Sequence, residues 1–284
     1  MNTLGQILFC AVRHIITMAT PLRDDIVSVL ADRYTTLRAL IDHPQAKREL
    51  EDTLDCSRST IDRAIRELRD ANLIHYEDGM WTPTLHGWCA YHARNKYHNH
   101  LADLVEAAPV LDNLPLDSPV DCAMLEGVDV YKVNASVPDM VVETILDYVS
   151  GATSVRIITP VVLIGFAKRL CERVADNERY DVELTIPKDV FKQVHATYPD
   201  LTASFIDDEN VQAYCASIPF SFGLLIVDDT NVGLLTFTDH GIGGFLMNDS
   251  EDAGAWAQKQ YERVRRNADP MFSEVISNND PTDH

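Results

Sequence analysis

Hydrophobic and polar residues alternate at helical spacing in residues 57–74, which read SRSTIDRAIRELRDANLI. At about 100° per residue, the apolar side chains of this stretch fall on one stripe. They are Ile61, Ala64, Ile65 and Leu68. The opposite side carries hydroxyls and guanidinium groups, and Ser57 is a favourable N-cap residue. The pattern predicts an amphipathic helix packed on one side. A surface helix of many proteins has the same pattern, so the neighbouring elements decide its meaning.

Two further helices and a hairpin surround this helix in the sequence. A helix is predicted from Asp24 to His43, because apolar residues recur at i, i+4, i+7 and i+11. A shorter helix over residues 46–54 follows, and two residues link it to Ser57. Residues 75–84 then hold an Asp-Gly pair between aromatic residues, which predicts two short strands joined by a turn. Two helices joined by a tight turn and followed by a hairpin are the arrangement of a winged helix-turn-helix.

A long helix is predicted next, over residues 84–108. Its candidates for burial are Leu85, Trp88, His92, Leu101, Leu104 and Val105. His86, Cys89 and His92 lie at i, i+3 spacing, and Cys with His suits zinc. Residues 86 and 92 diverge around a helix, so we expect packing or surface histidines and no metal site. Residues 109–119 hold three prolines and are predicted to form a hinge between domains.

Strands and helices alternate beyond this hinge. Strands are predicted at residues 128–133, 155–159, 182–186, 201–206, 220–227, 232–238 and 245–248. Helices are predicted at residues 136–149, 160–174, 187–196 and 250–266. Gly241, Gly243 and Gly244 are predicted to form a flexible link before the last strand. Repeated strand-helix units indicate a parallel or mixed sheet covered by helices, and therefore an α/β domain.

Charge is distributed unevenly along the chain. The 284 residues carry 24 basic and 44 acidic side chains, a net charge of -20. DNA affinity rests on cations that meet phosphates, so this balance argues against nucleic acid at first. Residues 20–100, however, carry a net charge of only -2, whereas residues 101–284 carry -19. The acidity therefore belongs to the second half. A surface rich in carboxylates resembles that of proteins from salt-loving archaea, where salt screens the repulsion.

The cysteines and the first residues bear on location. Six cysteines form no CxxC pair, which argues against a zinc ribbon or a disulfide framework and fits a reduced cytoplasmic protein. Residues 1–19 are apolar, but Arg13 interrupts them and no basic segment precedes them. A signal peptide or a membrane span differs in both respects. We expect residues 1–17 to be an extension from an upstream start codon, with Met18 as the true start of translation. The alternative is an amphipathic helix that binds a partner.

The sequence KRELEDTLDCSRSTIDRAIRELRDANLIHYEDGMWTPTLHG resembles archaeal winged helix-turn-helix transcription regulators over residues 24–105. The resemblance implies double-stranded DNA as partner and a homodimer whose two recognition helices, about 34 Å apart, read a palindromic site. The residues expected to contact DNA are Ser57, Arg58, Ser59, Thr60, Arg63, Arg66 and Arg69. Glu77 and Asp78 depart from the family at the wing tip, where many members carry Lys or Arg. Wing contacts to DNA are therefore not expected.

The segments TPVVL, IPFSFGLLIVDD, GLLTF and DAGAWAQKQYERVRRNA resemble the carboxy-terminal sensor domain of archaeal regulators related to the methanogenesis regulatory protein. Ligands of open sheets collect beyond the carboxyl ends of strands, and glycine-rich loops can hold anions. An unknown small-molecule effector is therefore expected at Thr159, Lys188, Asp239, Gly241, Gly243 and Gly244. Each of these glycines and charges also fits an ordinary turn or a solvated surface.

These elements predict an α+β chain: a winged helix-turn-helix followed by a mixed-sheet α/β sensor domain. We expect an extension (1–19), a DNA-binding domain (20–83), a linker or dimerisation helix with a hinge (84–117), a sensor domain (118–272) and a disordered tail (273–284). No GxSxG, Walker, HExxH or HxKxxxxD signature is present, so no catalytic residue and no cofactor are predicted. The sequence predicts a cytoplasmic, metabolite-controlled transcription regulator. The alternatives are a module whose winged helix docks a protein, and an enzyme sited in the second domain.

Overall fold

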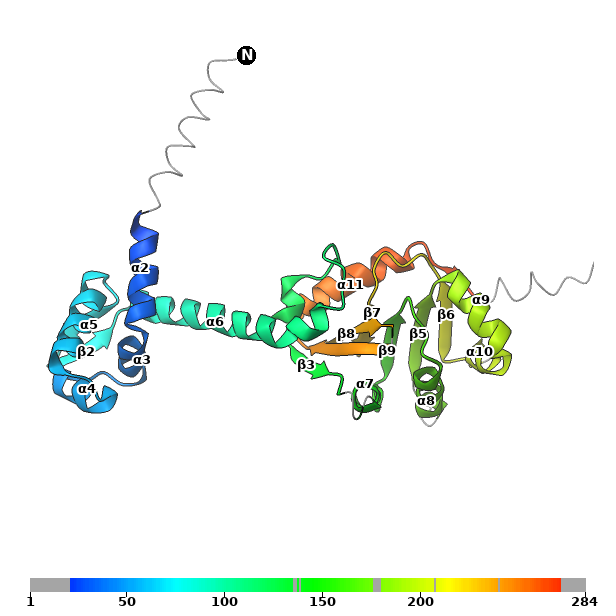
Figure 1. Cartoon of the computed structure of the whole chain (residues 1–284), viewed down its shortest axis with the longest axis horizontal. Helices are drawn as coiled ribbons and strands as arrows, with labels where there is room; N and C mark the ends of the chain where they lie inside the picture. Colours follow the sequence, from blue (N-terminus) through cyan, green and yellow to red (C-terminus); the bar gives the residue numbers. More distant parts are fainter. Residues whose placement is uncertain are drawn as a thin grey trace, which may run out of the picture. The chain divides into compact units, whose positions relative to one another are not determined.

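The computed structural model describes residues 21–134, 137, 139–175, 180–206, 208–239 and 241–271. It divides into two compact units, Met1–His98 and Asn99–His284 (Figure 1). The expected extension and tail lie outside the described residues. Among the described helices, none has both the length and the apolar character needed to cross a bilayer.

The first unit contains the winged helix-turn-helix that the sequence predicted. Its elements are α2 (Pro21–Asp32), α3 (Tyr34–Asp42), α4 (Lys47–Leu54), α5 (Arg58–Asp70), β1 (Ile74–Glu77) and β2 (Met80–Pro83). The single helix predicted from Asp24 to His43 is wrong, because α2 and α3 separate at Arg33. The Arg33 backbone has φ -116° and ψ 16°, which lies outside the helical region.

Apolar stripes of these helices form the core of the first unit. Leu37, Leu40, Leu50, Ile61, Leu68 and Leu73 are fully buried. At the wing, Tyr76 pairs with Trp81 across two antiparallel strands. Asp78 and Gly79 both have positive φ, 50° and 86°, as the turn type that matches strand twist requires. The predicted Asp-Gly hairpin is therefore confirmed.

The second unit is built on one mixed sheet of eight strands, in the order β10-β6-β5-β4-β7-β8-β9-β3. The strands are β3 (Asp129–Lys132), β4 (Ser154–Ile158), β5 (Asp181–Ile186), β6 (Val211–Cys215), β7 (Gly223–Val227), β8 (Asn231–Thr238), β9 (Gly241–Asn248) and β10 (Asp269–Pro270). Neighbours β4, β5 and β6 are parallel, and the remaining pairs are antiparallel. The predicted mixed sheet is confirmed.

Helices cover both faces of this sheet. They are α7 (Asp139–Val149), α8 (Ile164–Ala175), α9 (Lys188–Thr197), α10 (Pro199–Ile206) and α11 (Glu251–Arg265), with a short 3-10 helix at Cys122–Leu125. Leu224 and Ile226 point to the α11 side, whereas Leu225 and Val227 point to the α7 and α8 side. This alternation puts α11 on one face and α7 and α8 on the other (Figure 1).

Several predicted elements of the second unit are wrong, among them a strand and the start of a helix. Residues 201–206 were predicted as a strand but belong to helix α10. The next strand along the chain is β6, which the sequence did not predict. Residues 160–163 were predicted to begin a helix, but α8 begins at Ile164. The Thr159 hydroxyl donates to the Val161 carbonyl at 2.7 Å, and this local turn holds the segment outside the helix.

Helix α6 (Leu85–Leu111) runs from the first unit into the second, and most of its predicted burial is wrong. The apolar side chains at Leu85, Trp88, Leu101 and Val105 are 80%, 50%, 39% and 76% exposed, and His92 is exposed too. Tyr91, Ala107 and Val110 are buried instead. Part of the proline-containing stretch at 109–119 packs on the core of the second unit, since Val110 belongs to it and Leu114 contacts it.

Candidate nucleic-acid interface and ligand cavity

Helix α5 begins with a dense hydroxyl cap. The Ser57 hydroxyl accepts a hydrogen bond from the Thr60 amide at 3.3 Å, which satisfies one of the unpaired amides of the first turn. The same oxygen lies 2.9 Å from the hydroxyls of both Ser59 and Thr60. The cap therefore fixes the start of the helix and leaves three hydroxyls at one exposed end.

The two sides of α5 differ as the sequence pattern predicted. Ile61, Ala64, Ile65 and Leu68 are buried in the core of the first unit. All seven side chains predicted to contact DNA are exposed: Ser57, Arg58, Ser59, Thr60, Arg63, Arg66 and Arg69. The structure thus brings these side chains onto one helix at a free surface. Their contact with DNA stays a prediction.

Each carboxylate of α5 is held by a basic side chain. Asp62 accepts from the Lys47 ammonium of α4 at 2.5 Å. Glu67 accepts from Arg33 at 2.5 Å. The hydrogen bond from Lys47 lowers the pKa of Asp62, and the hydrogen bond from Arg33 lowers the pKa of Glu67, in both cases against the opposing effect of burial. Both carboxylates therefore stay ionised and paired.

The arginines of α5 differ in their availability. Arg69 binds the neighbouring Asp70 carboxylate with both Nη2, at 2.7 Å, and Nε, at 3.1 Å. Within the described part of the chain, Arg58, Arg63 and Arg66 form no ion pair or hydrogen bond through their side chains. Three exposed guanidinium groups are therefore available to an external anion, and Arg69 is available only if it exchanges its partner.

The wing presents acidic and aromatic side chains. Glu77 and Asp78 are exposed at its tip, and Glu77 accepts from His75 at 3.1 Å when that ring nitrogen carries the proton. Tyr76 is 60% exposed beside Trp81. The negative charge of the wing tip repels phosphate, whereas the exposed arginines of α5 attract it.

Sequence reasoning missed one basic group beside α5. Lys47 lies 15 positions before Asp62, on another helix, and its contact with that carboxylate appears only in the fold. Its side chain is 44% exposed, so it adds a cation to the surface formed by α4 and α5. Nothing in the spacing of Lys47 and Asp62 marks them as partners.

The residues predicted to bind an effector do not gather in one place. Thr159 follows β4, Lys188 begins α9, and Asp239 is exposed in the turn between β8 and β9. Thr159 lines a cavity in the second unit, while the other five predicted residues, all of them described, lie outside its lining. Contact of these residues with an effector stays a prediction.

The predicted flexible glycine link is wrong, because Gly241, Gly243 and Gly244 belong to strand β9. A methyl group on Gly243 would lie 2.9 Å from the Asn113 side chain, and one on Gly244 would lie 2.6 Å from Val110. These positions are glycine because the end of α6 and the residues after it pack closely on the strand. Close packing, rather than an anion-binding loop, accounts for these two residues.

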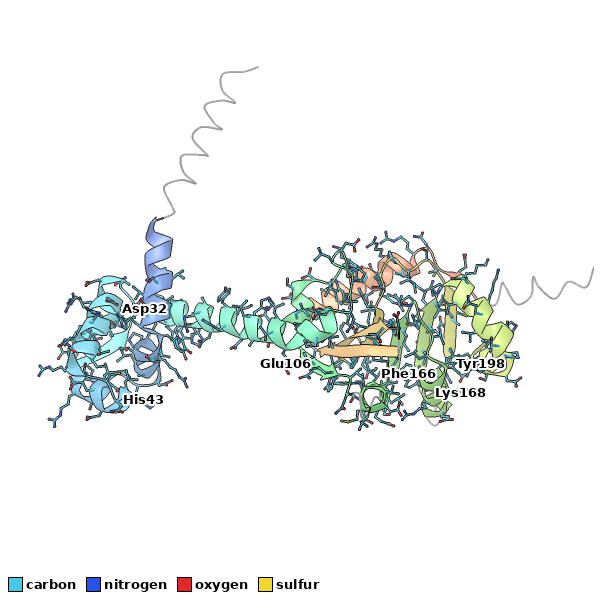
Figure 2. All side chains as sticks on the ribbon, viewed as in Figure 1. Asp32, His43, Glu106, Phe166, Lys168 and Tyr198 are labelled. Atoms are coloured by element: carbon cyan, nitrogen blue, oxygen red, sulfur yellow. The ribbon has the colours of Figure 1, made fainter. Side chains whose placement is uncertain are left out.

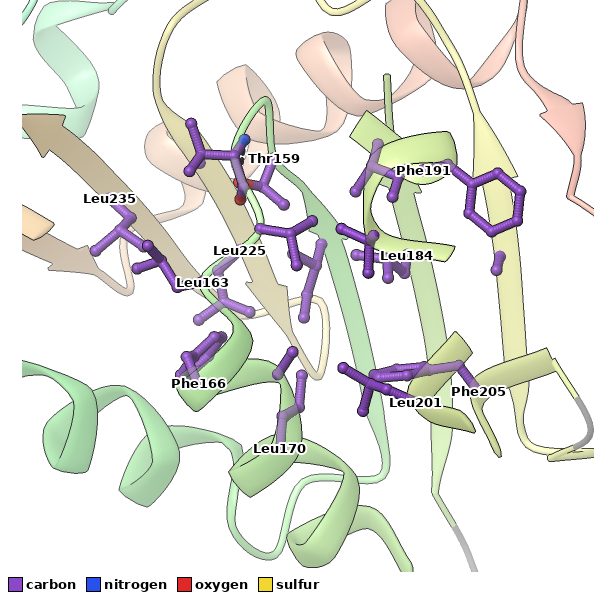
Figure 3. A pocket seen from close by; sticks show the side chains of 18 of the residues that line it. Thr159, Leu163, Phe166, Leu170, Leu184, Phe191, Leu201, Phe205, Leu225 and Leu235 are labelled. Atoms are coloured by element: carbon purple, nitrogen blue, oxygen red, sulfur yellow. Dashed lines mark hydrogen bonds between the residues drawn. The ribbon is translucent and has the colours of Figure 1, made fainter. Parts of the chain in front are cut away.

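The cavity lies between the sheet and the helices on the face opposite α11. Its volume is about 100 Å³. Side chains of α8, α9 and α10 and of β4, β5, β7 and β8 point into it (Figure 3). The labelled lining residues are Thr159, Leu163, Phe166, Leu170, Leu184, Phe191, Leu201, Phe205, Leu225 and Leu235. Apart from Thr159, sequence reasoning missed the lining of this cavity, because apolar side chains at strand and helix positions have the same pattern as an ordinary core.

The helices on the two sides of the cavity also meet at the surface. The Lys168 ammonium of α8 lies 5.6 Å from the centre of the Tyr198 ring, between α9 and α10 (Figure 2). The Lys168 ammonium and the negative face of the Tyr198 ring attract each other. Within the described residues, no three His, Cys, Asp or Glu side chains gather as a metal site requires.

Comparison with known families finds two matches. Residues 24–108 match the HVO_A0261 N-terminal domain, and residues 138–267 match the middle domain of the methanogenesis regulatory protein FilR1. No curated protein matches the chain significantly.

Likeness to solved structures is weaker. TrmBL2, an archaeal chromatin protein that binds DNA, is 11% identical over 87% of this chain and 99% of its own, with a TM-score of 0.36. NucT from Helicobacter pylori is 14% identical over 50% of this chain and 96% of its own, with a TM-score of 0.40. An IclR family transcriptional regulator from Brucella abortus is 12% identical over 84% and 92%, with a TM-score of 0.21. Scores this low carry no functional argument.

Proposed function

We propose that this chain, which matches the HVO_A0261 N-terminal domain and the middle domain of the methanogenesis regulatory protein FilR1, is a transcription regulator of this archaeal type that binds double-stranded DNA. One observation carries the proposal. Arg58, Arg63 and Arg66 are exposed on one helix of a winged helix-turn-helix, and the carboxylates of that helix are already paired.

The chemistry of this face suits a duplex. A guanidinium group can bind a phosphate or the O6 and N7 atoms of guanine through two parallel hydrogen bonds. Ser57, Ser59 and Thr60, with short hydroxyls at the start of α5, are proposed to contact phosphates and to fix the register of the helix in the major groove. Arg69 is proposed to contact the backbone after it releases Asp70.

A homodimer is the proposed binding form. Tyr97, Leu101 and Val105 lie at i, i+4 and i+8 on α6 and are 61%, 39% and 76% exposed. Apolar residues at this spacing suit a helix-helix contact. Two copies of the chain joined there would present two α5 helices to a palindromic site. The dimer is proposed to act in the cytoplasm, where the DNA is. The acidic second half of the chain suits a cytoplasm of high salt, because salt screens the repulsion among its carboxylates.

Control by a small molecule is proposed to act through the second unit. A ligand changes DNA affinity only if it binds two arrangements of the dimer with different affinities. The cavity under α8, α9 and α10 is the proposed place for such a ligand, because it is enclosed by elements that connect strands of the central sheet.

The salt dependence of DNA binding tests the proposal. Full-length protein is titrated into labelled duplex DNA from its own upstream region over a series of KCl concentrations, with circular dichroism to confirm folding at each. If at least three phosphates are neutralised per subunit, log K falls against log salt with a slope of about -3 or steeper per subunit. No binding at the lowest salt that keeps the protein folded would reject it.

Docking of a protein partner is the second candidate, and the acidic wing tip favours it. Glu77 and Asp78 would face DNA phosphates unfavourably but would suit a basic protein surface. In that case the wing lies at the centre of the interface with the protein partner, and replacing Glu77 and Asp78 by Lys abolishes the complex. The same pair of substitutions would strengthen binding if DNA is the partner.

A further inference from the structure

We propose that the cavity of the second unit binds a small, uncharged apolar molecule, of the size of one aromatic ring or a short branched hydrocarbon. The inference rests on the proposed function, since it names the chemical class of the effector. It departs from the sequence, which suggested an anion at a glycine-rich loop.

The walls of the cavity are apolar on every side. Leu163, Phe166 and Leu170 approach from α8 and the segment before it, and Phe191, Leu201 and Phe205 approach from α9 and α10 (Figure 3). Leu184 and Leu225 form the floor on the sheet. No charged side chain belongs to the lining among the residues that the structure describes.

The hydroxyls at the edge of the cavity already have partners. Thr159 Oγ1 donates to the Val161 carbonyl at 2.7 Å and accepts from the Val161 amide at 3.3 Å. Thr202 Oγ1 lies 2.7 Å from His195 Nδ1 and donates to the Pro199 carbonyl at 2.9 Å. A polar or charged ligand would therefore lose its hydration without gaining hydrogen bonds, which is strongly unfavourable. An apolar ligand has no such loss.

The size of the cavity suits one ring. An engineered apolar cavity of about 150 Å³ stays dry and binds benzene. The present cavity, at about 100 Å³, is of the same order and is lined by flexible Leu and Phe side chains that can adjust. An apolar molecule inside it would regain the dispersion contacts that the lining side chains lack.

The cavity lies against the sheet where β4 has β5 on one side and β7 on the other. The chain continues from β4 to β5 and β6 on one side of β4, whereas β7 lies on the other side. Strand β7 is antiparallel to β4, and Ile157, Leu184 and Leu225 of these neighbouring strands face the cavity. Thr159, the residue that follows β4, lines the cavity.

A second hollow adjoins the cavity near α7. Leu163 and Phe166 line both the cavity and a second, more polar hollow that also contacts Arg169. Arg169 is paired with Glu143 and so offers no free cation to an acidic ligand. Both shared side chains are only half-buried, so a small molecule can enter by displacing them.

Binding of toluene and of benzoate to the full-length chain tests the inference, because the two share a ring and differ by a charge. Ligand-observed NMR and thermal unfolding are recorded without DNA. Toluene is expected to bind saturably with one site per chain and to raise Tm, and benzoate is expected to bind at least about 100-fold more weakly because its charge would be buried.

Two variants locate the binding site. Ala167→Leu on α8 and Val194→Phe on α9 fill the cavity from opposite walls and should each weaken toluene binding at least tenfold. Ala255→Leu adds the same bulk as the first variant on the exposed side of α11 and should leave binding unchanged. Folding of each variant is checked by circular dichroism.

Three results would overturn the inference. They are no saturable toluene binding to the wild type, equal binding of benzoate, and unchanged toluene binding by a folded cavity-filling variant. None of these measurements contains DNA, so a chain that binds toluene but not DNA would reject the proposed function alone. A chain that binds DNA but not toluene would reject the inference alone.

Discussion

Carboxylates on helix α5 determine which of its arginines remain available. Asp62 engages Lys47, Glu67 engages Arg33, and Asp70 engages its neighbour Arg69. Two of the three partners come from outside the helix. As a result, a helix with four arginines and three acids presents three unpaired cations to solvent. A net charge counted along α5 would miss this distribution, because it treats paired and unpaired groups alike.

Asp62→Asn should strengthen DNA binding. The Asp62 carboxylate lies on the same helix as the free arginines, and its removal lowers the repulsion of nearby phosphates while freeing Lys47. A Coulomb term of about 1 kcal/mol or less in water corresponds to an increase of up to about fivefold. Fluorescence anisotropy at fixed salt measures it.

Asp42→Asn serves as the matched control, because Asp42 is a paired, exposed carboxylate of α3 in the same unit. It should change DNA affinity less than Asp62→Asn does. A decrease in affinity for Asp62→Asn would contradict the prediction and would mean that this carboxylate accepts a hydrogen bond from a base.

The exposed residues of α5 were predictable from the sequence because helical period is a local property. Ser57, Arg63 and Arg66 fall on the exposed side once the stripe of Ile61 and Leu68 is recognised. The pairs that neutralise the helix were not predictable. Arg33 and Glu67 lie 34 positions apart, and their contact depends on how two helices pack.

At the scale of elements, the contact of Arg33 with Glu67 joins α5 to the break between α2 and α3. The Arg33 side chain is 19% exposed, and its Nε donates to Glu67 at 2.5 Å. Its guanidinium lowers the pKa of Glu67 below the usual 4.5. The contact therefore stabilises the packed arrangement of these helices whenever Glu67 is ionised.

Stability of the first unit should consequently depend on the ionisation of Glu67. The folded pKa is the lower one, so the contribution is complete above pH 4.5 and is lost as the pH falls through the folded value. Glu67→Gln should accelerate hydrogen exchange of α5 amides at pH 7 relative to the wild type. The two proteins should exchange alike once the pH lies below both pKa values.

Arg33→Met provides the control for this experiment. In that background Glu67→Gln should have little further effect on exchange at pH 7, because the partner is already absent. An equal difference between wild type and Glu67→Gln at pH 7 and at the acid end would contradict the assignment.

Most elements of the second unit were predictable from the sequence, and the errors have identifiable causes. In α10, the alternating pattern of residues 201–206 suggested a strand, although Pro199 and Asp200 at the first turn are typical of a helix start. Strand β6, Val211–Cys215, was missed because the strand expected between the neighbouring elements had already been assigned to residues 201–206. In β9, Gly243 packs closely on Asn113 and Gly244 on Val110 of α6, and no local pattern contains these tertiary contacts.

At the scale of the whole molecule, α6 carries apolar residues that its own chain does not bury. Tyr97, Leu101 and Val105 form one stripe, and a second copy is the proposed partner. The cavity likewise needed the fold, because its lining combines residues from six strands and four helices. The sequence shows that these residues are apolar, but its pattern does not predict that a cavity remains between them.

Leu101→Glu with Val105→Glu should convert the proposed dimer to a monomer. Two carboxylates per helix would be buried against each other in the dimer, which is unfavourable. Sedimentation equilibrium should show a dimer dissociation constant at least tenfold higher, and DNA affinity should fall with it. A monomeric wild type would contradict the proposal.

Asn99→Glu with His92→Glu is the matched control. Both residues are exposed on α6 but lie away from the stripe, so the pair adds the same charge without changing the proposed contact. The control should sediment as the wild type does. An equal effect of both pairs would mean that charge on α6, rather than the apolar stripe, governs association.

DNA affinity of Arg63→Ala with Arg66→Ala, measured against Arg38→Ala over a salt series, tests the central claim most directly. Arg38 is an exposed arginine of α3 in the same unit, so the control also removes exposed positive charge. The double variant should bind at least tenfold more weakly, with a salt slope shallower by about 2 per subunit. Unchanged affinity and slope in the folded double variant, or an equal loss in Arg38→Ala, would contradict the account.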